Sequence, residues 1–252
     1  MAQLEKFKAI VLKKTKLSEN DLIITFLLED GSQLRAVAKG ARKPTSIFSA
    51  RLDLFNIVDI YSVRGKSLYI LRDVKLITWH STIKKNMDKF LCSSVVSELL
   101  YKSTHYKLIC NNLFDITKKF LYTLDNVENK HYYNPLCFAA LWKICFYLGV
   151  GPIVDRCIYC EKSINIINFA DSIHLSFNIL DGGLICRSCS KNHEAININS
   201  GTIKLIYMLL YTKFDRITLL KINDEYIKDM LKLARQWINC HLGCHIKSLN
   251  FI

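Results

Sequence analysis

The chain has 252 residues, half of them hydrophobic, and a net charge of +13. This length and apolar content can build the cores of two or three small domains. The longest apolar stretch, residues 135–150, contains Lys143 and is shorter than the roughly 20 residues that span a bilayer. The N-terminus lacks the apolar run of a signal peptide. The composition therefore excludes a membrane-spanning protein and predicts a soluble, cytoplasmic one.

The positive charge extends over the whole chain, with +6 in residues 1–80, +4 in 81–150 and +3 in 151–252. A basic surface attracts polyanions, of which nucleic acid is the commonest. A lysine-rich surface that only keeps the protein in solution is the alternative. Charge alone does not decide between the two.

The first part of the chain is rich in short segments typical of β-strands. Asp30-Gly31 is a strong hairpin signal between the second and third segments. The predicted strands are residues 7–14, 21–29, 32–39, 52–63 and 67–77. Five short antiparallel strands favour a closed barrel, because closure removes exposed edges. We expect an OB-fold nucleic-acid-binding domain over residues 1–80, with an SH3-like barrel as the alternative.

A cluster of cations lies on the third predicted strand and the loop after it. Alternation places Arg35, Val37 and Lys39 on one face of the strand and Leu34, Ala36 and Ala38 on the other. The predicted DNA-binding residues are Arg35, Lys39, Arg42 and Lys43. Such cations on a barrel can bind phosphates, and aromatic rings can stack on bases. The aromatic candidates, each also a candidate for the core, are Phe48, Phe55, Tyr61 and Tyr69. An ordinary solvated loop is the alternative.

From residue 83 the hydrophobic period changes from 2 to 3.6, which predicts a helical domain over residues 81–252. Apolar stripes predict helices over residues 83–99, 113–124, 134–148, 200–210 and 227–241. Asn134 and Ser200 are the expected N-caps of two of them. The helix over 134–148 is apolar on nearly all sides, so we expect it at the centre of a bundle, ending at Gly149.

Four cysteines in two Cys-x₂-Cys pairs interrupt the helical pattern. Cys157 and Cys160 precede Cys186 and Cys189 by 25 intervening residues, and Asp181-Gly182-Gly183 predicts a turn just before the second pair. Four thiolates in this spacing are typical of one structural, tetrahedral zinc ion per chain. Two disulfides or four free thiols are the alternatives. We expect residues 153–195 to be a zinc-binding insertion within the helical domain, giving an α+β protein overall.

Other residues of similar chemistry have less specific spacing. Cys240, His241, Cys244 and His245 lie near the C-terminus, but His241 continues an apolar helical stripe, which favours packing over metal binding. The six cysteines outside the two pairs are scattered, as is typical of free thiols in a reducing cytosol. No catalytic motif is present, so we expect no enzymatic activity.

The order of these motifs resembles the RecO family of bacterial recombination mediators. The resemblance depends on Glu19-Asn20-Asp21 before an apolar strand, Asp30-Gly31, the run from Ala38 to Lys43, the two cysteine pairs with Gly182-Gly183 between them, and Lys247-Ser248-Leu249. It covers essentially the whole chain. The resemblance implies a nucleoid-associated protein that binds single- and double-stranded DNA and anneals complementary strands.

The resemblance also implies protein partners. These are RecR, the acidic C-terminal tail of single-stranded-DNA-binding protein, and, functionally, RecA. Lysines that can attract the tail in the predicted helical domain are Lys84, Lys85, Lys89, Lys118 and Lys119. Two other classes remain open: a zinc-dependent nucleic-acid enzyme, for which Glu161 and Asp181 are the nearest carboxylates, and a zinc-ribbon protein that only docks other proteins.

Overall fold

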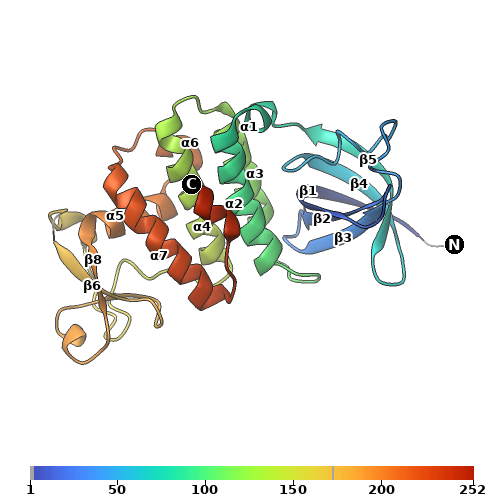
Figure 1. The fold of residues 1–252 in the computed structure, drawn as a ribbon. Coiled ribbons are helices and arrows are strands. Elements are labelled where there is room, and N and C mark those ends of the chain that lie inside the picture. The colour runs from blue at the N-terminus through green and yellow to red at the C-terminus, as the bar shows by residue number, and fades with distance from the viewer. Residues whose placement is uncertain (1–2, 172) are drawn as a thin grey trace. The chain divides into compact units, whose positions relative to one another are not determined.

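The computed structural model describes residues 3–171 and 173–252, which divide into two compact units, Met1–Asn126 and Val127–Ile252. The first unit contains a closed barrel (Figure 1). Its strands are β1 (Leu4–Lys16), β2 (Leu22–Leu28), β3 (Gln33–Ala38), β4 (Ile57–Arg64) and β5 (Tyr69–Thr78). Their order around the barrel is β1-β2-β3-β5-β4, and β3 and β5 form the one parallel pair among them. This is the strand order of an OB-fold, as the sequence predicted.

Strand β1 joins the two sides of the barrel. Its first half pairs with β4 and its second half with β2, with a register shift between Val11 and Lys13. Such a bulge bends a strand so that it can follow a curved sheet. Side chains that point inward fill the barrel, including Ile24, Phe26, Leu34, Val58 and Ile60, each almost inaccessible to solvent.

The connection from β3 to β4 also contributes to this core. The predicted strand 52–63 is wrong at its start, because residues 52–56 form turns and β4 begins at Ile57. Phe55 has a positive φ of 69°, which ends the extended run. Ala41, Phe48 and Leu52 are buried against the barrel core. Leu52, the first residue of the predicted strand, is therefore buried by packing on the barrel core and not by strand pairing.

Three helices complete the first unit: α1 (Ser81–Lys85), α2 (Met87–Ser103) and α3 (Asn112–Asn126). The sequence predicted one helix across Asn86. Instead, the Asn86 side chain accepts a hydrogen bond from the Lys89 N–H and caps a new helix. Met87 is consequently 70% exposed rather than part of the apolar stripe.

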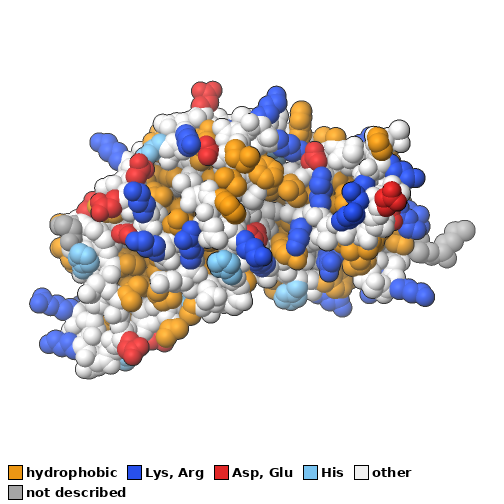
Figure 2. All heavy atoms as spheres, in the orientation of Figure 1, with side chains coloured by type: hydrophobic (Ala, Val, Ile, Leu, Met, Phe, Trp, Pro, Cys, Tyr) orange, Lys and Arg blue, Asp and Glu red, His pale blue; other side chains and the backbone are white. Residues whose placement is uncertain are grey.

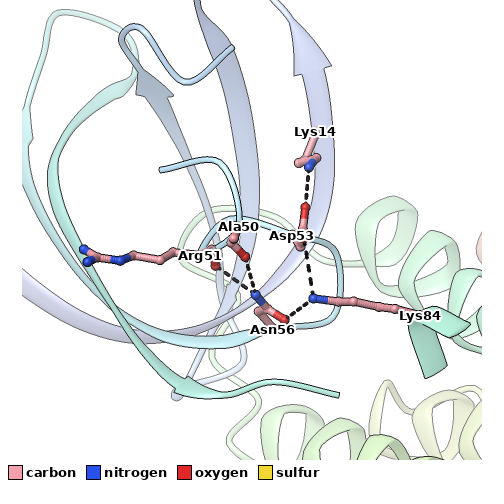
Figure 3. Close-up of polar contacts among 6 residues, drawn as sticks. All are labelled: Lys14, Ala50, Arg51, Asp53, Asn56 and Lys84. Carbon is pink, nitrogen blue, oxygen red and sulfur yellow. Dashed lines mark hydrogen bonds and ion pairs between the residues drawn. The ribbon is translucent and has the colours of Figure 1, made fainter. Parts of the chain in front are cut away.

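A polar network ties α1 to the barrel (Figure 3). Asp53 accepts a hydrogen bond from Lys14 at 2.9 Å and pairs with Lys84 at 3.7 Å. The Lys84 ammonium also donates to the side-chain oxygen of Asn56, whose amide nitrogen donates to the carbonyls of Ala50 and Arg51. Burial lowers the pKa of Lys84, and the carboxylate of Asp53 acts in the opposite direction. The network fixes the turn before β4.

The second unit is largely helical. Its helices are η1 (Lys130–Tyr132), α4 (Tyr133–Tyr147), η2 (Ile166–Asn168), η3 (Cys189–Lys191), α5 (Ser200–Tyr211), α6 (Phe214–Ile217), α7 (Asp224–Leu242) and η4 (Lys247–Phe251). Helix α4 is buried along nearly its whole length, as its apolar sequence predicted, and ends before Gly149, whose φ is +80°.

Two predicted N-caps of this unit are displaced. Helix α4 begins at Tyr133, before the predicted cap Asn134, because the short helix η1 leads directly into it. Asn199, not Ser200, caps α5 through its side-chain oxygen, while the Ser200 hydroxyl donates to the carbonyl of Ala170. Within residues 3–171 and 173–252, no helix is both long and apolar enough to span a bilayer.

A small antiparallel sheet interrupts the helices of the second unit. Its strands are β6 (His174–Asn178), β7 (Gly183–Ile185) and β8 (Ile196–Asn199), in the order β7-β6-β8. Gly182 turns the chain between β6 and β7 with a φ of +96°, and Gly183 lies so close to Ile153 that a Cβ would be 2.4 Å from its carbonyl oxygen. The turn predicted at Asp181-Gly182-Gly183 is therefore confirmed.

Candidate metal centre and nucleic-acid interface

Each Cys-x₂-Cys pair lies in a tight backbone turn. In the first, the Glu161 N–H donates to the Cys157 carbonyl and the Cys157 N–H to the Lys162 carbonyl. Glu161 adopts a positive φ of 58°, which lets the chain reverse directly after Cys160. In the second, the Ser190 N–H donates to the Cys186 carbonyl. Both turns direct their thiols to the same point.

The two turns are held together by β7. The Ile158 N–H in the first turn donates to the Leu184 carbonyl, and the Leu184 N–H donates to the carbonyl of Ile153. Because β7 leads directly into Cys186, these backbone hydrogen bonds place the first cysteine pair beside the second. The local sequence therefore sets each turn, and strand pairing sets their distance.

The four thiol sulfurs lie within 4.8 Å of one another, and those of Cys160 and Cys186 are 3.6 Å apart. A tetrahedral zinc with Zn–S bonds of 2.3 Å needs sulfurs about 3.8 Å apart. All ten cysteines are free thiols, which argues against the alternative of two disulfides. The cluster can hold a metal ion such as zinc.

The thiol pKa values show why a cation suits this cluster. Burial raises the pKa of Cys157, but hydrogen bonds from the backbone of Cys186, Cys160 and Tyr159 outweigh it and lower that pKa to about 6. The hydrogen bond with the Cys186 side chain leads the causes that raise the pKa of Cys189 to about 12. The first thiolate forms easily and the last does not, because negative charge accumulates. A bound cation removes this penalty.

Other candidate ligands near the cluster have different contacts. His193 stacks on Tyr159 with ring centroids 3.5 Å apart, and the Tyr159 hydroxyl donates to Asp181 at 2.5 Å. Near the C-terminus, His241 packs against Trp237. Among the described residues, the four cysteines are the one group of three or more that can share a metal.

The four predicted DNA-binding residues are all exposed, on β3 or in the loop after it, but Arg42 has partners that the other three lack. Arg35 and Lys39 are exposed on β3 and just after it, while Leu34, Ala36 and Ala38 are buried, so the predicted alternation is confirmed. Lys43 is exposed in the following loop. The guanidinium of Arg42, in contrast, donates to the carbonyls of Ser18 and Glu19 and so anchors the loop between β1 and β2. The contact of these residues with DNA stays a prediction.

Of the four aromatic candidates, Phe48 and Phe55 are buried and cannot stack on a base. Tyr61 lies between the ammonium groups of Lys6 and Lys75, at 5.7 and 5.5 Å from its ring centroid. Tyr69 lines a pocket together with Arg35. The sequence reasoning missed further members of that pocket, namely Arg64, Lys66, His105 and Tyr106. Arg64-Gly65-Lys66 is a turn signal between two predicted strands, but the sequence does not show that this turn meets residues 105 and 106.

Lysine and arginine side chains are scattered over the face drawn in Figure 2, over the barrel and over the helices, with fewer acidic side chains among them over the barrel. The fold and the site thus define a class: an OB-fold protein with a basic barrel surface, helices, and a four-cysteine metal site. OB-fold barrels are commonly used to bind oligonucleotides or oligosaccharides.

Comparison with known families narrows this class. The family model described as "Recombination protein O N terminal" matches residues 1–80, and "Recombination protein O C terminal" matches residues 84–250. The chain belongs to the RecO family of DNA repair and recombination proteins.

Full-length relatives agree with this assignment. "DNA repair protein RecO" of Caldanaerobacter subterraneus subsp. tengcongensis is 28% identical over 249 residues, covering 98% of this chain and 96% of the relative. The protein of the same name from a Thermoanaerobacter species is 28% identical, covering 99% and 97%. That of Listeria monocytogenes is 24% identical, covering 99% and 94%.

Proposed function

We propose that this protein is a non-enzymatic, cytoplasmic recombination mediator that binds single- and double-stranded DNA and anneals complementary strands. The observation that carries the proposal is the closed OB barrel with exposed cations on β3 and its exit loop, in a chain of the RecO family. Two strands that approach each other repel through their phosphates. A cationic barrel neutralises both at once and so lowers the barrier to pairing.

The four-cysteine cluster has a structural role in this proposal. One zinc ion per chain, held by Cys157, Cys160, Cys186 and Cys189, would cross-link the two turns around β7. Bound zinc supplies no chemistry here beyond charge and cross-linking, because four thiolates close its coordination sphere. The metal thereby fixes the sheet β7-β6-β8 within the helical part of the chain.

The family also suggests protein partners: RecR, RecA, and the C-terminal tail of single-stranded-DNA-binding protein. The structure narrows the lysines that can attract an acidic tail. Lys89 is 2% exposed and donates to the Asp125 carbonyl, and Lys84 belongs to the network with Asp53. Lys85, Lys118 and Lys119 are exposed. We propose these three as the attractive charges.

A salt titration tests DNA binding by the barrel. The test variant changes Lys39 and Lys43 together to alanine. It retains Arg42, because Arg42 anchors a loop. Each lost phosphate contact flattens the slope of log affinity against log salt by roughly 0.7 for single strands and 0.9 for duplex. The double variant should therefore lower that slope by about 1.4 and 1.8, for all sequences alike, and slow annealing.

The matched control changes Lys228 and Lys232, two exposed lysines of α7, to alanine. It removes the same charge far along the chain from the barrel, so the slope should stay near that of the wild type. Equal effects of both double variants would mean that net charge, and not the barrel loop, controls binding.

A further inference from the structure

A pocket of about 410 Å³ opens on the first unit beside β3. Its walls come from three segments: β3, the β4–β5 loop, and the loop between α2 and α3. Figure 1 shows the α2–α3 loop next to the end of β3. The lining residues are Gln33, Arg35, Arg64, Gly65, Lys66, Ser67, Leu68, Tyr69, His105 and Tyr106. The volume is within the range of small-ligand sites.

Hydrogen bonds fix the α2–α3 wall of this pocket. The Gln33 N–H donates to the His105 carbonyl at 3.2 Å, and the Gln33 amide donates to the carbonyls of Tyr101 and Thr104 at 3.0 and 3.1 Å. The Cys110 N–H donates to the Asp30 carbonyl. Gly31 lies so close to Cys110 that a Cβ would be 2.0 Å from its carbonyl oxygen. The wall is therefore in place before any ligand arrives.

The pocket concentrates positive charge. Arg35, Arg64 and Lys66 line it, and no carboxylate does. Among the residues that the structure describes, none of these three cations forms an ion pair. Uncompensated cations in a recess attract an anion, and the planar fork of an arginine matches a phosphate.

An aromatic ring stands at the same place. Tyr106 is 48% exposed, and it interacts with the hydroxyl of Tyr69. Tyr69 is held in turn by edge-to-face packing on Phe7, with ring centroids 5.8 Å apart. Burial, and then the interaction with Tyr106, raise the pKa of Tyr69 to about 12, so it stays a neutral hydroxyl. Tyr106 is thus a half-exposed ring beside the pocket cations, with the Lys107 ammonium 5.7 Å from its centroid.

We infer that this pocket holds one unstacked nucleotide of a single DNA strand, with its phosphate on Arg35, Arg64 and Lys66 and its base against Tyr106. The inference rests on the proposed function and deepens it. A base inside a duplex is stacked on both sides and cannot enter, whereas an unpaired base can. The pocket therefore gives the barrel a preference for single strands that the charges at Lys39 and Lys43 do not supply.

An acidic peptide is a weaker fit to the same pocket. A short peptide that binds tightly needs an apolar recess for an anchor side chain, while this lining is rich in polar and charged groups, including Ser67 and His105. A flat, half-exposed ring next to phosphate-binding cations is the combination that single-strand binders use.

The test measures the binding of a labelled thymidine strand that contains one 2-aminopurine, and of the matching duplex. Tyr106→Ala should weaken single-strand affinity about tenfold, abolish the quenching of 2-aminopurine, and leave duplex affinity unchanged. Tyr106→Phe keeps the ring and should behave as the wild type. Arg64→Gln with Lys66→Gln should weaken the single strand more than the duplex.

Other outcomes would contradict either the pocket inference or the proposed function. If Tyr106→Ala binds the single strand as tightly as the wild type does, the pocket inference is wrong while the proposed function stands. A wild-type chain that binds neither DNA would contradict the proposed function itself. If thymidine monophosphate displaces the labelled strand at concentrations similar to those at which the strand binds, the ligand of the pocket is a free nucleotide. If the pocket variants lose binding of an acidic peptide but keep DNA binding, the ligand of the pocket is a peptide. Both results overturn the inference.

Discussion

The barrel of the first unit and the three-stranded sheet of the second are stabilised in different ways. Every barrel strand pairs on both sides, and the enclosed space is filled by apolar side chains such as Phe26 and Ile60. The sheet β7-β6-β8 is open, and β7 has only three residues. A segment this small cannot bury a core of its own. This sheet instead lies beside a four-cysteine cluster that can hold a metal ion, and its Phe177 packs on Trp237 of α7.

Removing the metal should have the largest effect, and it should affect the sheet β7-β6-β8 without affecting the barrel. Cys186→Ser should lose the metal and unfold the segment around β6, β7 and β8, because structural zinc contributes on the order of 10 kcal/mol to such sites. The barrel amides should stay protected from hydrogen exchange, because the barrel core shares no residue with the metal site. Metal analysis and peptide-resolved hydrogen exchange measure both effects.

The matched control is Cys240→Ser, which changes an exposed cysteine of α7 outside the cluster. It should retain one metal per chain. Stoichiometric zinc in the Cys186→Ser protein would contradict the assignment of that residue as a ligand.

The reverse experiment removes apolar volume from the barrel. Phe26 is fully buried, and Phe26→Ala should lower the free energy of unfolding of the first unit by about 3–5 kcal/mol. Metal content should not change. Chemical denaturation monitored on the barrel gives the loss. Ile47→Ala, at a residue 58% exposed, should change it by less than about 0.5 kcal/mol.

A smaller effect is expected from the network in Figure 3. Asn56 is inaccessible to solvent and satisfies two backbone carbonyls and Lys84. Asn56→Ala leaves these groups unpaired and should cost about 1–3 kcal/mol in denaturation experiments. Combining it with Lys84→Met should cost less than the two single changes added together. Strict additivity would show that the two side chains act independently.

The second unit partly buries Lys143, and burial is the one cause that shifts its pKa. Burial lowers the pKa of Lys143 to about 8, although its ammonium donates to the Leu210 carbonyl. The unfolded chain, with a lysine pKa of about 10.4, therefore binds more protons between pH 8 and 10. Ionisation of Lys143 therefore makes the free energy of unfolding rise with pH across that window.

The measurement compares the unfolding free energy of the wild type with that of Lys143→Met from pH 7 to pH 10. The difference should shift by about 1–2 kcal/mol in favour of the wild type as pH rises, a figure discounted because the ammonium is partly solvated. A difference that is flat with pH would place the Lys143 pKa near its ordinary value.

Features set by neighbouring residues could be predicted from the sequence. The alternation at Leu34–Ala38, the Asp30-Gly31 hairpin and the two cysteine turns depend on local geometry, and the structure contains all three. The pocket could not be predicted in this way. Arg35, Arg64 and Tyr106 come from three segments that meet only after the barrel closes and α2–α3 pack on it.

The partners of long side chains could not be predicted from the sequence either. Lys84 and Lys89 were expected to attract an acidic tail, but their ammonium groups reach Asp53 and the Asp125 carbonyl. A long side chain can fold back toward an acceptor that is distant in sequence. Asn86 was likewise missed as a helix cap, because an apolar stripe continues through it.

The pairing of β3 with β5 has a consequence for how the protein is synthesised. This parallel seam joins Ala36 to Tyr69 and Val37 to Ile70, and it closes the barrel with only these two partner pairs. Strands β1, β2 and β3 leave the ribosome as a consecutive antiparallel meander, but the ring cannot close until β5 follows, because the seam bridges a long loop. The nascent chain therefore exposes one unpaired edge of β3 throughout the synthesis of β4. Arg35 lies on that edge strand and Lys39 directly follows it, and like charges at such an edge disfavour pairing between two chains.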